Sequence, residues 1–150
     1  LSQVIGPLRI GGFGYIGQER SDFVDDITVW GPDATLALGP AIELNGQFLR
    51  RKDTNPFFAS AGTENIVDSA FGELIWSLQG PTGKWHATAL YNWIKSDGQF
   101  TLNGNVMQKY QTASAGLHYL ARRNVRFLGD IGYDIEQERT RMTVGAFLAW

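Results

Sequence analysis

The feature that most constrains this chain is an alternation of apolar and polar residues with a period of two. It is clearest in residues 125–136, where Phe127, Ile131 and Tyr133 alternate with Arg126 and Asp130. A period of two is the pattern of a β-strand whose two faces meet different surroundings. Helical spacing with capping residues is nearly absent, so the sequence predicts an all-β fold.

Eight segments show strand character, and their order along the chain predicts an up-and-down antiparallel arrangement. The parity of the second segment is lost around Gly31 and Pro32, which suggests a β-bulge or an edge position because proline cannot donate to a ladder. The segments are residues 7–18, 27–38, 42–49, 72–79, 85–94, 111–121, 125–136 and 141–150.

The connections between these segments alternate in length. Residues 38–41, 79–84 and 121–124 are rich in Gly, Pro and Asn and predict tight turns. Residues 19–26, 52–69 and 96–108 are longer and polar, and predict loops at the opposite end of the strands. Membrane β-barrels show the same asymmetry between their two ends.

Composition excludes several classes of protein. The 150 residues suit one domain and include no cysteine, so there is no disulfide framework, thiolate metal site or haem-attachment motif. The net charge of -2 and the mixed acids and bases argue against nucleic acid as a partner. No apolar run reaches the ~20 residues of a membrane helix. We expect no cofactor and no metal.

Aromatic residues gather at the two ends of the predicted apolar face. Trp and Tyr are enriched at the two membrane–water interfaces, because one part of each side chain is apolar and the other is polar. A soluble lipocalin-like barrel, with its apolar face turned inward around a ligand, remains the alternative. The predicted girdle residues are Trp85, Tyr119 and Trp150 at the tight-turn end, and Tyr91, Trp93 and Tyr133 at the loop end.

The opposite face of the same strands is polar, and in a membrane barrel it would face the lumen. The predicted lumen-lining residues are Glu43, Asn45, Gln47, Glu73, His86, Asn92, His118, Arg126, Asp130, Asp134 and Arg141. If the barrel were closed and filled, Arg126 and Arg141 would need to pair with the acids across it, because buried charges require partners.

The chain resembles the outer-membrane porins of Gram-negative bacteria, most closely the carboxyl-terminal half of a larger porin. The resemblance is carried by residues 43–51, 89–93, 120–126 and 145–150. It implies an outer-membrane location, contact with the lipid bilayer and lipopolysaccharide, and a terminal strand read by the barrel-assembly machinery. The residues that match this terminal signal are Met142, Val144, Ala146, Leu148 and Trp150.

The expected function depends on how the barrel closes. Eight strands leave an interior just filled by side chains, whereas ~16 leave an aqueous channel. Because Leu1 resembles a position inside a longer sequence, we expect residues 1–150 to form one barrel domain or the carboxyl-terminal part of one, which passes ions and small solutes. The alternatives are a barrel that sheathes a partner such as a cytochrome, a closed structural barrel, and the lipocalin-like binder; a homo-oligomer remains open.

Catalysis is not expected. Ser114 and His118 share a strand face but lie roughly 13 Å apart, too far for a nucleophile and its base. The loop acids could bridge divalent cations to lipopolysaccharide, but their spacing matches no defined calcium loop and ordinary solvation is favoured. These acids are Asp22, Asp25, Asp26, Asp53, Glu64 and Asp68.

Overall fold

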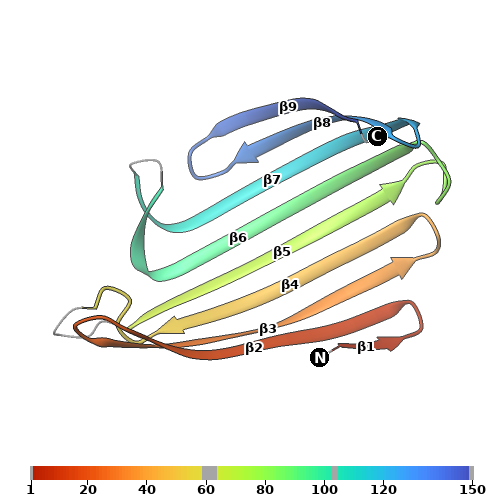
Figure 1. Ribbon diagram of the computed structural model, residues 1–150. Helices are drawn as coiled ribbons and strands as arrows, with labels where there is room; N and C mark the ends of the chain where they lie inside the picture. The colour runs from red at the N-terminus through yellow and green to blue at the C-terminus, as the bar shows by residue number, and fades with distance from the viewer. Residues whose placement is uncertain (1, 59–63, 103–104, 149–150) are drawn as a thin grey trace.

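The computed structural model describes residues 2–58, 64–102 and 105–148, which form one antiparallel β-sheet (Figure 1). The all-β prediction is confirmed. The strands are β1 (Ser2–Ile5), β2 (Leu8–Arg20), β3 (Val24–Leu38), β4 (Ile42–Asp53), β5 (Asn65–Ser77), β6 (Trp85–Leu102), β7 (Asn105–Arg122), β8 (Val125–Asp134) and β9 (Arg139–Leu148).

Each strand pairs with the strand that follows it in the sequence, so the up-and-down order is also confirmed. The sheet has nine strands rather than the predicted eight. The additional strand is β1, which is too short to show an alternation and turns into β2 at Gly6. Within the described residues β1 and β9 each pair on one side only, and the sheet does not close on itself.

The tight turns lie where they were predicted, but two of the three predicted long loops are wrong. Gly39 and Gly80 take φ values of 71° and 79°, which glycine reaches without strain. In contrast, the β2–β3 hairpin continues to Arg20 and Val24, and β6 continues to Leu102 beyond an irregularity after Lys95. Polar side chains do not end a ladder, because its hydrogen bonds are made by the backbone.

The bulge or edge position predicted around Gly31 and Pro32 is also wrong. β3 lies between β2 and β4, and its register with β4 is the same at Trp30 and at Asp33 on either side of the missing pairs. Pro32 has no N–H to donate, so the ladder is interrupted without being shifted. Gly31 is required here because a Cβ atom would collide with the carbonyl oxygen of Phe48.

The register sorts the side chains onto two faces, which we call the polar face and the apolar face. Every residue predicted to line a lumen lies on the polar face, from Glu43 on β4 to Arg141 on β9. All predicted girdle and terminal-strand residues that the structure describes lie on the apolar face; Trp150 lies outside the described residues.

No second layer of structure covers either face in the described part of the chain. Ile27 is its one buried hydrophobic residue, whereas Ile16, Met142 and Val144 are 85%, 77% and 88% exposed. The described residues contain no helix that is long and apolar enough to cross a membrane. A sheet of this kind must bury its apolar face against something other than its own side chains.

Replacing Gly31 by alanine should destabilise the sheet, because the added methyl group forces β3 away from Phe48 on β4. We expect a loss of about 1 to 3 kcal/mol in the free energy of unfolding, measured by denaturant titration in detergent. The control is Gly129→Ala, whose Cβ atom would enter open space. Equal stability of the two variants would contradict the close approach at Gly31.

Candidate functional site

Aromatic side chains cross the apolar face in two separate rows. At the tight-turn end, Trp85, Tyr119 and Phe127 are in register on β6, β7 and β8. The ring centroids of Trp85 and Tyr119 are 4.6 Å apart. At the loop end, Phe48 and Trp93 flank Ala70 in one row. We call these rows, together with Tyr91 and Tyr133, the aromatic girdles.

Small and aliphatic side chains fill the apolar face between the girdles. Ala87 and Ala89 on β6 lie beside Leu117 and Ala115 on β7. On β9 the predicted terminal pattern of Met142, Val144, Ala146 and Leu148 continues the same surface. This band is uninterrupted by charge from β6 to β9, so it forms one continuous apolar surface.

The central part of the polar face carries carboxylates held by an amide. The Asn45 side-chain N–H group donates to Glu43 at 3.0 Å and to Glu73 at 3.1 Å. On neighbouring strands, Asn92 donates to the Thr112 hydroxyl at 3.2 Å. Both carboxylates are therefore positioned by a neutral amide.

The two histidines are direct cross-strand neighbours on the polar face. His86 Nδ1 lies 3.1 Å from the Ser77 hydroxyl, while its buried Nε2 has no hydrogen-bond partner. His118 Nε2 lies 3.4 Å from an Asp130 carboxylate oxygen, in space left by Gly116. Sequence reasoning missed these contacts because each joins residues of different strands.

The pairing of Arg126 and Arg141 with acids of this face, which a closed and filled barrel would require, is not found. In the described ranges no ion pair joins either arginine to Glu43, Glu73, Asp130 or Asp134. Arg126 instead lies over the ring of Phe147, 4.9 Å from its centroid. Among the described residues, neither arginine is therefore compensated by a carboxylate of the polar face.

An apolar strip crosses the loop-end third of the polar face, which the alternation did not predict. Leu49, Phe71, Ile94 and Tyr110 belong to it and line a shallow hollow of about 330 Å³ with Gln47 and other residues. Farther along the same face, on β2, Phe13 and Tyr15 are 54% and 49% exposed. The polar face thus includes a region suited to contact with apolar groups.

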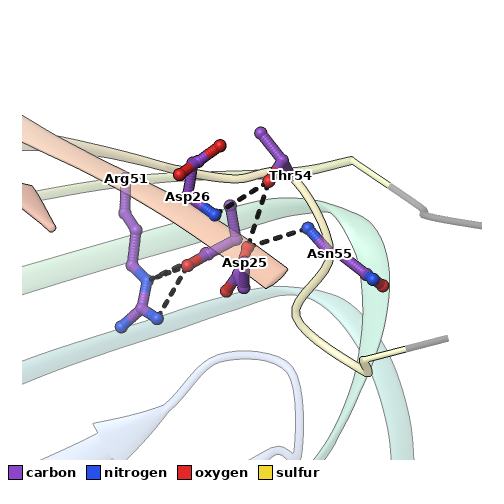
Figure 2. Close-up of polar contacts among 6 residues, drawn as sticks. Asp25, Asp26, Arg51, Thr54 and Asn55 are labelled. Atoms are coloured by element: carbon purple, nitrogen blue, oxygen red, sulfur yellow. Dashed lines mark hydrogen bonds and ion pairs between the residues drawn. The ribbon is translucent and has the colours of Figure 1, made fainter. Parts of the chain in front are cut away.

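At the loop end, a cluster of polar residues joins the β2–β3 and β4–β5 hairpins (Figure 2). The buried Asp25 accepts hydrogen bonds from the Asn55 backbone N–H at 2.8 Å and from the Thr54 hydroxyl at 3.4 Å. Arg51 donates three hydrogen bonds to the buried Asp53, from Nε at 2.9 and 2.8 Å and from Nη2 at 2.8 Å. We call Asp25, Arg51, Asp53, Thr54 and Asn55 the loop-end cluster.

The predicted solvation of the loop acids is therefore wrong for Asp25 and Asp53, which are buried, whereas Asp22, Asp26 and Glu64 are exposed. Asp25 and Asp53 are buried in the loop-end cluster, and Glu64 pairs with Lys52 at 2.7 Å. Asp68 lies on β5, where Arg50 contacts it at 2.7 Å. No group of three potential metal ligands is present among the residues described.

Two lysines of the apolar face were missed as candidate residues. Lys95 and Lys109 are paired across β6 and β7, one row beyond Trp93 on the loop side. The regular alternation ends at Ile94 and resumes at Gln111, so both lysines fall beside the loop predicted at residues 96–108. The strands continue past these points, and both lysines lie on the same face as Trp93.

Replacing Arg51 by glutamine should weaken the loop-end cluster, because it leaves the carboxylate of Asp53 buried without its cation. We expect a loss of about 1 to 3 kcal/mol in the free energy of unfolding. Lys52→Gln is the matched control, since its partner Glu64 is half exposed and the pair is worth less than about 1 kcal/mol. Similar losses for both variants would show that the burial of Asp53 has no energetic effect.

Comparison with models of known protein families finds no match, and comparison with curated protein sequences finds none either.

Proposed function

We propose that this chain forms the wall of an outer-membrane β-barrel through which ions and small solutes diffuse passively. The observation that carries the proposal is the single sheet with an uncovered apolar face bounded by two aromatic girdles. A soluble barrel buries its apolar side chains inside. Here the large apolar side chains are exposed, and lipid is the surrounding that removes them from water.

The spacing of the girdles supports a membrane span. Trp85 and Trp93 are the first and last aromatic residues of the apolar face on β6, with Ala87, Ala89 and Tyr91 between them. At ~3.3 Å per residue and a tilt of ~40°, their Cα atoms are roughly 20 Å apart along the barrel axis. This separation is close to the ~25 Å apolar band of outer-membrane barrels.

The chemistry of the polar face supports a water-filled lumen over a filled one. Glu43 and Glu73 are held by Asn45, and Arg126 lies over Phe147 rather than beside an acid. A dry interior would leave such charges uncompensated at a cost of several kcal/mol each, whereas water stabilises them. A hydrated path for ions and small polar solutes follows from this arrangement.

The number of strands supports a barrel larger than this sheet. With nine strands, β1 and β9 run in the same direction, so they cannot pair antiparallel with one another. An antiparallel barrel closes with an even number of strands, so a closed barrel built on this sheet would include an odd number of further strands between β9 and β1. A wider barrel has room for an aqueous channel.

A second candidate function is a barrel that encloses a partner protein or an inserted segment. The observation in its favour is the exposure of Phe13 and Tyr15 on the polar face, near the apolar strip around Phe71. Aromatic side chains in a lumen are favoured where a protein surface covers them. Conductance distinguishes the two functions, since an occupied barrel would not pass ions freely.

Arginine placed at the centre of the apolar face should oppose membrane insertion. Ala89 lies midway between Trp85 and Trp93, so we expect Ala89→Arg to cost about 2 to 4 kcal/mol in folding into lipid vesicles. Thr88→Arg is the control at the same depth, because Thr88 lies on the polar face close to Gly116 and Asp130. Equal costs for the two variants would rule out a lipid-facing apolar surface.

Single-channel recording of the full protein in a planar bilayer tests the pore itself. We expect ohmic openings, with a preference for cations because of the carboxylates on the polar face. Glu43→Gln combined with Glu73→Gln should reduce that preference, read from the reversal potential in a salt gradient. A folded, inserted protein that never conducts would overturn the pore and favour the enclosed partner, and a protein soluble without detergent would overturn both.

A further inference from the structure

A row of charged side chains crosses the apolar face directly beyond the loop-end girdle. Arg50, Asp68, Lys95 and Lys109 are in register on β4, β5, β6 and β7. The adjacent row toward the tight-turn end contains Phe48, Ala70, Trp93 and Gln111. We call Arg50, Asp68, Lys95 and Lys109 the basic row; it lies where an apolar surface gives way to a charged one.

The basic row carries more positive than negative charge. Asp68 neutralises Arg50, which it contacts at 2.7 Å through two hydrogen bonds. Lys95 and Lys109 are both exposed and form no ion pair in the part of the chain that the structure describes. Asp97 and the Lys52–Glu64 pair lie farther from the girdle, on the loop side of the row.

Two lysines directly opposite one another are an unfavourable arrangement in a sheet by themselves. Like charges at paired positions repel, and this repulsion destabilises the strand pair. Lys95 and Lys109 are such a pair, at the last regular position before the irregularity in β6. An anion bound between their ammonium groups converts the repulsion into attraction.

From this geometry we propose that Lys95 and Lys109 bind a phosphate group of an anionic lipid headgroup in the membrane leaflet at the loop end. The inference rests on the proposed membrane span. Trp93 lies one row below the lysines, at the height of the interface, and the phosphates of a lipid lie immediately above that height. Lysine acts as a flexible point charge for phosphate and suits a headgroup that moves with its acyl chains.

Arg50 and Asp68 border the proposed site on the side of β4 and β5. Arg50 donates from two of its nitrogens to Asp68, so this carboxylate neutralises its charge. Asp68 is the neighbour of Lys95 in the register and makes its two hydrogen bonds with Arg50 on the other side. The free anion-binding capacity is therefore concentrated on β6 and β7.

The test is lipid binding by the full protein in detergent micelles, counted by native mass spectrometry. The probe is lipid A with two phosphate groups, and the comparison lipid is phosphatidylcholine. We expect retention of lipid A by the native protein and a loss of affinity of about thirtyfold in Lys95→Gln with Lys109→Gln. Lys95→Arg with Lys109→Arg should retain binding because the charge is kept.

The control variant carries Lys84→Gln and Arg122→Gln, which removes two cations from the tight-turn end of the sheet. Unchanged lipid A binding in this variant supports the site, whereas an equal loss in both variants shows attraction by net charge alone and overturns it. Competition by millimolar inorganic phosphate would identify a site for free phosphate and also overturn it. The glutamine variant should still conduct, so loss of lipid binding and failure of the pore are separate outcomes.

Discussion

The structure depends on the antiparallel register that links nine consecutive strands, which shifts after Lys95 in β6 and after Leu120 in β7. Because side chains alternate between the two sides of a strand, one residue of slippage would move a whole set of side chains to the opposite face. The register of β4 with β5 places Asn45 beside Glu73, and that of β6 with β7 places Trp85 beside Tyr119. Both the apolar band and the polar network follow from this single constraint.

Packing between side chains contributes little to the stability of the sheet. Ile27 is the one buried hydrophobic residue in the described segments, whereas ordinary domains bury their apolar residues between two layers. Backbone hydrogen bonds and polar contacts at the loop end, such as Arg51 with Asp53, hold the hairpins together. The larger stabilising contribution must come from the surroundings of the apolar face, and this is the physical basis for proposing a lipid bilayer.

The alternation of residues predicted the faces well and the ends of the strands poorly. The predicted lumen-lining residues all lie on the polar face, because the alternation of side chains is a local property of the backbone. Lys95 and Lys109 lie beyond the segments of regular alternation, although β6 and β7 include both of them. Arg126 lies over Phe147 rather than beside an acid, which differs from the pairing that a closed and filled barrel would require.

The sequence by itself determined the class of fold, the order of the strands and the two unlike faces, because each of these follows from the period of two and from the residues of the turns. Only the tertiary structure decided which residues meet across strands. The pairing of His86 with His118, the burial of Asp25 and Asp53, and the row from Arg50 to Lys109 all depend on register. Register is set by the lengths of whole hairpins, and no single segment of the sequence contains that information.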